Sequence, residues 1–267
     1  MSTIGLIAGG GRFPLLFAES ARRAGHRVVA TGFVRQTLPQ LEQAVDALTW
    51  VKLGEFGKIA AALRAGGAEG AVMLGGVAKA RFFRDVFPDL AGLKILAQVA
   101  IRSDDNLLRA VARWLEEEGF PVLDPSPYLA DRLAPEGVLG RHAPSEGEWK
   151  DARYGLELAR GIGLLDLGQT VVVKDGVAVA VEALEGTDAC IRRGGELARG
   201  GAVVAKAVKP QQDRRFDLPA IGPDTVGVMR AVKARVLAVE AGATLIMDRE
   251  ETIRRADEAR IAIVGLR

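Results

Sequence analysis

Three carboxylates and two guanidinium groups gather in one short stretch of the second half of this chain. Glu182, Glu185 and Asp188 fall within seven residues, and Arg192 and Arg193 follow at once. Carboxylate oxygens are the ligands that Mg²⁺ prefers, while guanidinium groups bind phosphate oxygens well. Acids next to bases therefore favour phosphoryl chemistry, in which a metal ion and cations offset the charge of a phosphate.

The same stretch also carries the signals of a turn into a helix. Glu185, Gly186 and Thr187 follow directly on an expected strand, and Gly186 permits a sharp turn there. Thr187 or Asp188 is expected to cap the next helix, and capping alone would account for Thr187. The functional interpretation makes the Glu185 to Thr187 turn part of a substrate site.

A long charged loop follows, between an expected strand and an expected helix. Pro219 and Pro223 stiffen this loop. A solvated surface is the alternative, but the length and stiffness of the loop argue for a binding site. The residues that we expect to contact substrate or its phosphate charge here are Lys206, Lys209, Gln212, Arg214, Arg215 and Thr225, with Asp213 as an acidic member of the catalytic set.

Asp224 lies where the helix after this loop begins. A carboxylate at a helix N-terminus can cap the helix, and that role alone would explain the residue. The position also lets Asp224 orient a metal ion or a water molecule beside the free N–H groups of the first turn. The two roles can coexist.

The first half opens with a glycine turn between a strand and a helix. Gly9, Gly10 and Gly11 follow a short apolar strand, an arrangement that can cradle a phosphate. A tight turn that binds nothing is the alternative. Pro14 stands where a dinucleotide fingerprint has its third glycine, and no acid ends the second strand, so hydride transfer is disfavoured. A mononucleotide or a sugar nucleotide fits the turn better.

Composition excludes several classes of protein. The net charge of the 267-residue chain is +2, without the basic excess typical of nucleic-acid binding, and no apolar run approaches the length of a membrane helix. No signal peptide is evident, and Cys190 is the single cysteine, so we expect a cytoplasmic protein. His26 and His142 are too few for a zinc site or a recognisable serine triad, so any metal should be hard and oxygen-bound.

Alternating strands and helices in the first half predict a Rossmann-like domain with a parallel sheet. A cluster of prolines and glycines between 121 and 144 marks a connection, and we place the boundary there, giving domains 1–134 and 135–267. The second half is expected to be a mixed α/β domain, with a hairpin turned at Asp175-Gly176. In its last part, 224–241 is expected to be helical, followed by a strand at 244–247, a helix at 250–259 and a strand at 261–264.

Several of these stretches together resemble one family. The chain reads G-G-G-x-x-P after the first strand, E-G-T-D-A after a later strand, and K-P-x-Q-D-x-R-F-D-x-P-x-x-G-P-D-T from Lys209 to Thr225. With the closing segment Met247 to Glu250, these residues resemble the LpxI family of UDP-2,3-diacylglucosamine pyrophosphatases from end to end.

The resemblance implies hydrolysis of the pyrophosphate of UDP-2,3-diacylglucosamine to UMP and 2,3-diacylglucosamine 1-phosphate (lipid X), in lipid A biosynthesis. It also implies Mg²⁺ dependence, enclosure of the lipid by two domains, and a homodimer. By resemblance, Asp224 is closest to catalysis and the turn Gly9 to Gly11 belongs to the nucleotide pocket. We therefore assign Asp224 to metal binding or water activation, Asp188 to metal binding, and Asp213 to metal binding or support of that site.

Two further hypotheses complete the analysis. Phe82 and Phe83, between basic residues, could meet acyl chains or an anionic membrane surface, so the protein could lie peripherally on the inner membrane. Packing of these rings in the core of the first domain is the alternative. One rival function is an oxidoreductase or epimerase that uses the first domain as a nucleotide-cofactor fold, which Pro14 and the missing acid disfavour. The other is a lipid or nucleotide-sugar carrier without turnover, which would leave the acids and bases near Asp224 unexplained.

Overall fold

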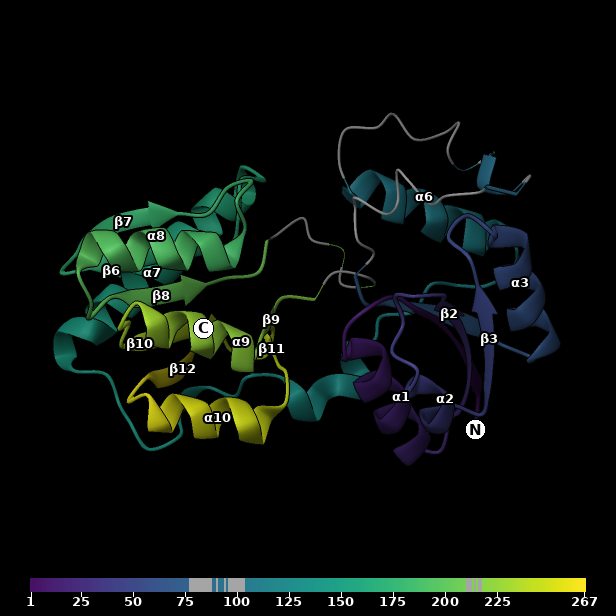
Figure 1. The fold of residues 1–267 in the computed structure, drawn as a ribbon, viewed down its shortest axis with the longest axis horizontal. Coiled ribbons are helices and arrows are strands. Elements are labelled where there is room, and N and C mark those ends of the chain that lie inside the picture. Colours follow the sequence, from purple (N-terminus) through teal and green to yellow (C-terminus); the bar gives the residue numbers. More distant parts are fainter. Residues whose placement is uncertain are drawn as a thin grey trace. The chain divides into compact units, whose positions relative to one another are not determined.

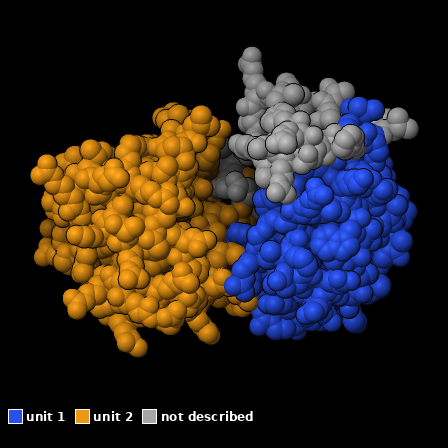
Figure 2. All heavy atoms as spheres, viewed as in Figure 1, with its two compact units in different colours: residues 1–129, 214–217 blue, residues 130–213, 218–267 orange. Residues whose placement is uncertain are grey.

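A computed structural model describes residues 1–76, 88–89, 91–93, 95, 104–209, 213, 215 and 218–267. The chain divides into two compact units, which Figure 2 shows in different colours. The first unit comprises residues 1–129 with 214–217, and the second comprises residues 130–213 with 218–267. Each unit is an α/β structure built on its own sheet, so the predicted fold class is confirmed.

The sheet of the first unit has four parallel strands in the order β3-β2-β1-β4. Chain order reverses between β1 and β4, which makes the gap between their carboxyl ends the topological switch point of the sheet. Strands β1, β2 and β4 are almost entirely buried, as expected for parallel strands covered on both faces, whereas the edge strand β3 is largely exposed. Their bounds are β1 (Thr3–Ala8), β2 (Arg27–Phe33), β3 (Ala47–Val51) and β4 (Gly70–Leu74).

Helices cover this first sheet. Ile59 and Leu63 of α3 and Trp114 and Leu115 of α6 pack with one face of the strands. Helix α1 contacts β1 and β2 and begins with Pro14 in its first turn, where a missing N–H costs no helical bond. The helical segments of this half that the structure describes with both ends are α1 (Phe13–Arg23), α2 (Leu41–Ala44), α3 (Phe56–Ala65), α6 (Asp104–Glu117) and η1 (Ser126–Arg132), which leads into the second unit.

The sheet of the second unit has six strands in the order β5-β12-β10-β8-β6-β7 (Figure 1). Strands β8, β10 and β12 run parallel, while β6 runs antiparallel to both β7 and β8, and β5 runs antiparallel to β12. The sheet is therefore mixed, as the sequence predicted. Its strands are β5 (Gly137–Leu139), β6 (Thr170–Lys174), β7 (Val177–Val181), β8 (Val203–Lys206), β10 (Val236–Glu240) and β12 (Ala262–Leu266).

In the described part of the second unit, four helices cover the sheet in two layers. Ala152 and Leu156 of α7 pack on one face, while Ile191 of α8, Met229 of α9 and Ala256 of α10 pack on the other. Helix α7 begins with a capping box, in which Ser145 and Glu148 satisfy each other's backbone N–H groups. The bounds are α7 (Glu146–Leu164), α8 (Thr187–Ala198), α9 (Pro223–Ala231) and α10 (Arg249–Glu258).

A separate pair of short parallel strands joins the loops that precede α9 and α10. Strand β9 (Ala220–Ile221) pairs with β11 (Leu245–Ile246). Beyond the paired residues, Met247 N donates to Ile221 O at 2.8 Å. The two helices therefore begin side by side.

The prediction of one long helix at 224–241 is wrong. The segment 224–241 is not a single helix: α9 ends at Ala231, Lys233 takes a positive φ of 55°, and residues 236–240 form β10. The run Val236 to Val239 is fully buried at the centre of the sheet, where β-branched side chains pack well. Apolar residues in this stretch fit helical spacing as well, so tertiary burial decided the outcome. Among the described helices, none has the length and apolar character needed to cross a membrane.

Candidate active site

Three helix N-termini gather at one edge of the second sheet. Helices α8, α9 and α10 each follow a strand and begin near the carboxyl ends of β7, β8 and β10, on the same face of the sheet (Figure 1). Open α/β sheets bind ligands outside the carboxyl ends of their strands. Thr187 and Asp188 of the first long motif, and Asp224 and Thr225 at the end of the second, lie in the first turns of two of these helices.

The start of α8 differs from the sequence prediction. Neither Thr187 nor Asp188 caps the helix: the N-cap is Gly186, with φ 82° and ψ 167°, and no side chain of the described residues caps the first turn. The Thr187 hydroxyl instead donates to Glu182 Oε1 at 3.1 Å. Asp188 lies exposed in the first turn, where the helix dipole favours a negative charge.

Lys206 lies between the start of α8 and the start of α9. Lys206 is only 8% exposed, and its Nζ donates to Ala220 O at 2.8 Å, just before α9. On the neighbouring strand Thr170 is its register partner, and Thr170 Oγ1 lies 3.3 Å from Thr187 Oγ1. The predicted phosphate-binding lysine therefore lies on the strand edge between two helix N-termini.

Asp224 occupies the first turn of α9. The N-cap is Gly222, Pro223 follows, and no side chain of the described residues caps the helix, so the capping role expected of Asp224 is wrong. Asp224 is exposed and Thr225 is half-buried. An exposed carboxylate beside uncapped N–H groups can hold a cation or orient a water molecule.

The closing segment Met247 to Glu250 lies next to this turn. A Cβ added at Gly222 would come within 3.2 Å of Met247 Cβ. Asp248 follows as the N-cap of α10, with a positive φ of 41°. The β9–β11 pairing thus brings together two segments that are about 25 residues apart, which spacing within either motif could not reveal.

The backbone that follows β8 is held by Glu240 of β10, which is itself bound by Arg160 of α7. Val208 N donates to Glu240 Oε2 at 2.9 Å, while Arg160 donates to Glu240 Oε1 from Nε at 3.1 Å and from Nη2 at 2.8 Å. Lys209 Nζ lies 3.0 Å from Asp166 Oδ1. Sequence analysis singled out Lys209 but none of the other four residues, because their partners come from distant elements.

Glu185 and Arg193 form a pair of their own. Arg193 donates to Glu185 Oε1 and, at 2.8 Å, to Val181 O, while Ala183 N donates to Glu185 Oε2 at 3.0 Å. The hydrogen bond from Arg193 lowers the pKa of the exposed Glu185 carboxyl below its ordinary value. This pair stabilises the turn between β7 and α8.

The rest of the charged loop is described only at two residues. Asp213 is half-buried. Arg215 Nη1 lies 2.9 Å from Glu116 Oε1 of α6 in the first unit. The expected ligands Gln212 and Arg214, and the aromatic pair Phe82 and Phe83, lie outside the described residues.

The glycine turn of the first unit lies at the β1/β4 switch point. Gly9 N donates to Leu74 O and Gly10 N donates to Gly76 O, both at 2.7 Å. A Cβ on Gly9 would lie 2.5 Å from Gly75 O, so this turn requires glycine for backbone approach. The N–H groups of Gly9 and Gly10 are therefore used within the fold, and Gly11, with φ 86°, is the member of the turn with open space around it.

Two family models match the chain in succession. The LpxI N-terminal domain matches residues 3–132, and the LpxI C-terminal domain matches residues 135–264. The chain belongs to the LpxI family. A relative from Caulobacter vibrioides, the UDP-2,3-diacylglucosamine pyrophosphatase LpxI, is 38% identical over 279 residues, which cover all of this chain and 98% of the relative.

Solved structures give much weaker likenesses. Phosphoribosylglycinamide synthetase from Anaerococcus prevotii is 12% identical over 69% of this LpxI-family chain and 39% of its own, with a TM-score of 0.27. N5-carboxyaminoimidazole ribonucleotide synthetase from Thermotoga maritima is 14% identical over 67% and 40%, with a TM-score of 0.26. The chain spans about two fifths of each of these proteins, and scores this low carry no argument.

The donor set of this LpxI-family chain fits Mg²⁺ better than it fits a metal with a full protein cage. In the described part of the chain, no three His, Cys, Asp or Glu side chains gather as a metal site. Mg²⁺ usually takes one or two carboxylates and completes its shell with water and substrate phosphate. Asp224 and Asp188, both exposed on first helical turns, are carboxylates of the kind required.

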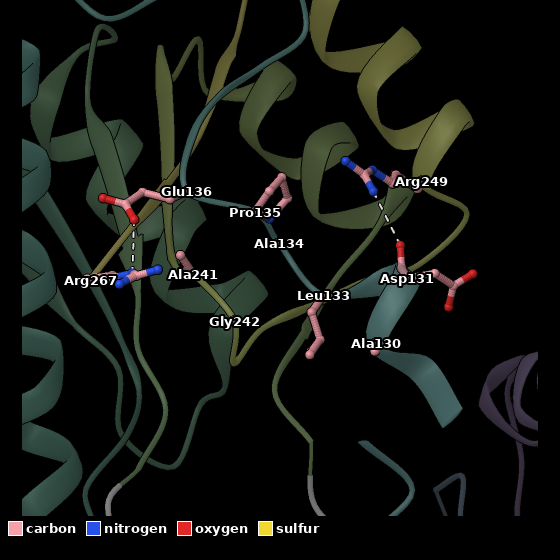
Figure 3. A pocket seen from close by; sticks show the side chains of 10 residues that line it. All are labelled: Ala130, Asp131, Leu133, Ala134, Pro135, Glu136, Ala241, Gly242, Arg249 and Arg267. Atoms are coloured by element: carbon pink, nitrogen blue, oxygen red, sulfur yellow. Dashed lines mark hydrogen bonds and ion pairs between the residues drawn. The ribbon is translucent and has the colours of Figure 1, made fainter. Parts of the chain in front are cut away.

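A hollow of about 410 Å³ lies at the same edge of the second sheet, beyond β10 and β12 (Figure 3). Residues 130–131 and 133–136, Ala241 and Gly242 after β10, Arg249 and Arg267 line it. Arg249 Nη1 donates to Asp131 O at 3.3 Å, and Arg267 Nε lies 2.9 Å from Glu136 Oε2. Both guanidinium groups thus have partners in its wall.

Proposed function

We propose that this chain is a UDP-2,3-diacylglucosamine pyrophosphatase of lipid A biosynthesis. It hydrolyses the substrate's pyrophosphate and releases UMP and 2,3-diacylglucosamine 1-phosphate, with Mg²⁺ as cofactor. The observation that carries the proposal is the full-length match to a relative of that name. The geometry of the second unit supports it, because Asp188, Lys206 and Asp224 lie at one sheet edge.

Attack of water on a pyrophosphate needs a positioned water molecule and neutralised charge on the phosphate oxygens. Asp224 and Asp188 would hold Mg²⁺, which when bound supplies positive charge to the pyrophosphate. Asp224, on the exposed first turn of α9, can also accept a proton from water.

Backbone N–H groups would help to neutralise the negative charge of the substrate's pyrophosphate oxygens. The first turns of α8 and α9 begin at glycines and carry no side-chain cap among the described residues, so their N–H groups can bind phosphate oxygens. Lys206 adds a cation on the strand edge between them. In the first unit, the β1/β4 switch point is the expected place for the nucleotide, with Gly11 and the start of α1 as its donors.

Release of UMP from UDP-2,3-diacylglucosamine tests the proposal directly. We expect release by the unmodified protein with Mg²⁺, and loss of release with EDTA. Asp224→Asn, which keeps the side-chain shape, should lower kcat by roughly 10²- to 10⁴-fold with a smaller change in KM. Glu196→Gln, an exposed change near the end of α8, is the matched control and should leave turnover unchanged.

Two outcomes would contradict it. A folded, unmodified protein that releases no UMP would remove the proposed activity and leave a carrier role. Asp224→Asn with normal, Mg²⁺-dependent turnover would keep the activity and remove the assignment of Asp224. Assembly as a homodimer and contact with a membrane surface are further parts of the proposal, tested by light scattering and by sedimentation with anionic vesicles.

A further inference from the structure

Glu182 has a buried carboxylate that the proposed mechanism leaves without a role. The residue follows β7 and is 7% exposed. Both carboxylate oxygens have partners: Oε1 accepts from the Thr187 hydroxyl at 3.1 Å, and Oε2 accepts from Gln169 N at 3.3 Å. Burial of a carboxylate costs free energy unless such partners compensate it, so the arrangement is specific.

These contacts decide what Thr187 can do. Its hydroxyl hydrogen is committed to Glu182, so its oxygen acts as the acceptor at the 3.3 Å contact with Thr170 Oγ1. Thr170 is fully buried in β6, beside Lys206 in the strand register. The hydroxyl of Thr187 therefore makes only internal hydrogen bonds. Among the described groups here, the donors left for a ligand are the N–H groups of the first turn of α8.

We infer that Glu182 is a positioning residue for the proposed hydrolysis. Its carboxylate binds both Thr187, the first residue of α8, and the N–H of Gln169, just before β6. Because β6 pairs with the strand that carries Lys206, these contacts fix the first-turn N–H groups of α8 relative to Lys206. Gly186 makes this tie necessary, since a glycine N-cap offers no side chain to hold the turn. The inference rests on the proposed function for its effect on turnover, and on the contacts alone for its effect on α8.

The test compares Glu182→Ala and Glu182→Gln with Glu196→Gln, which changes an exposed carboxylate on the same helix. The readouts are kcat and KM for UMP release, and hydrogen exchange of the amides of residues 187–190. Glu182→Ala should lower kcat by roughly ten- to a hundredfold, because misplaced donors lose transition-state contacts. It should also raise exchange in the first turn of α8. Glu182→Gln keeps one acceptor oxygen, so it should recover most of the kcat and most of the protection of the first turn of α8 from hydrogen exchange.

Thr187→Val supplies an independent variant that leaves the carboxylate in place. It should reproduce part of the loss of kcat, and the double variant with Glu182→Ala should be no worse than Glu182→Ala alone, because both changes remove the same Thr187–Glu182 hydrogen bond. Normal kcat in Glu182→Ala, or a loss that Glu182→Gln does not recover, would overturn the inference.

Failure of the proposed function gives a different pattern. In that case the unmodified protein releases no UMP, while exchange in the first turn of α8 still separates Glu182→Ala from Glu196→Gln. Unchanged exchange in Glu182→Ala would overturn the positioning role even in that case.

Discussion

The two units place glycine between a strand and a helix in the same topological position, yet the glycines do different work. In the first unit, Gly9 and Gly10 bond to the exit of β4, and their N–H groups are consumed there. In the second unit, Gly186 and Gly222 are N-caps that supply no side-chain hydrogen bond, so the first-turn N–H groups that follow them are left uncapped by the N-cap residue. One pattern therefore serves backbone packing in the first unit, and in the second unit it leaves the helix N–H groups available for the proposed anion binding.

The largest effect should come from Gly9→Ala. A Cβ there would lie 2.5 Å from Gly75 O and 2.8 Å from Gly76 O, and neither backbone atom can move cheaply. We expect the free energy of unfolding of the first unit to fall by about 3 kcal/mol. Gly11→Ala, with open space but φ 86°, should cost only about 1 kcal/mol. Urea unfolding measures both, and equal losses would contradict the packing role.

Gly186→Ala should have an intermediate effect on stability. The added Cβ meets nothing within 4 Å, but φ 82° with ψ 167° is a conformation that essentially only glycine adopts. We expect a loss of about 2 kcal/mol in the free energy of unfolding and a displaced start of α8. Turnover should then fall more than it does in Gly11→Ala. A stable variant with normal kcat would show that the N-cap geometry is not required.

The smallest effect concerns Cys190, whose N–H bonds Gly186 O in the first turn of α8. A helix start usually lowers a thiol pKa, but burial raises the pKa of Cys190 from 9.0 to about 12. The unfolded state therefore loses its proton first, and this contribution to stability declines as pH rises above about 9.

Labelling with a thiol reagent checks this prediction. At pH 8 the native protein should react very slowly, and urea should restore the rate of an ordinary thiol. Gly186→Ala should accelerate labelling while Gly11→Ala should not, since only the former loosens the start of α8. Fast labelling of the unmodified protein would contradict the burial of the thiol.

Local patterns were sufficient to predict most of the fold. Apolar runs and glycine punctuation located both sheets and the hairpin at Asp175-Gly176, because these signals depend on near neighbours. They failed at β10, where the residues fit a helix and a strand equally well and only burial between β8 and β12 decides. The caps expected at Thr187 and Asp224 were also wrong, since glycines are the N-caps of both helices. The hydroxyl of Thr187 donates to Glu182 instead.

The candidate site shows a comparable limit. Sequence identified Lys206, Asp188 and Asp224 as chemically capable, and the fold puts all three at one sheet edge. Sequence could not identify Glu240 as the anchor of Val208, because that contact joins residues 32 positions apart. Side-chain chemistry can be recognised along the chain, but the partner of each group depends on topology.

The small β9–β11 pair has a consequence for how this protein can change over generations. A Cβ added at Gly222 would lie 3.2 Å from Met247 Cβ, so a larger residue at position 222 should favour a smaller side chain at position 247. Sequence drift at these two positions should therefore be correlated among descendants. The starts of α9 and α10 are thereby coupled through one contact, although they are separated in the chain.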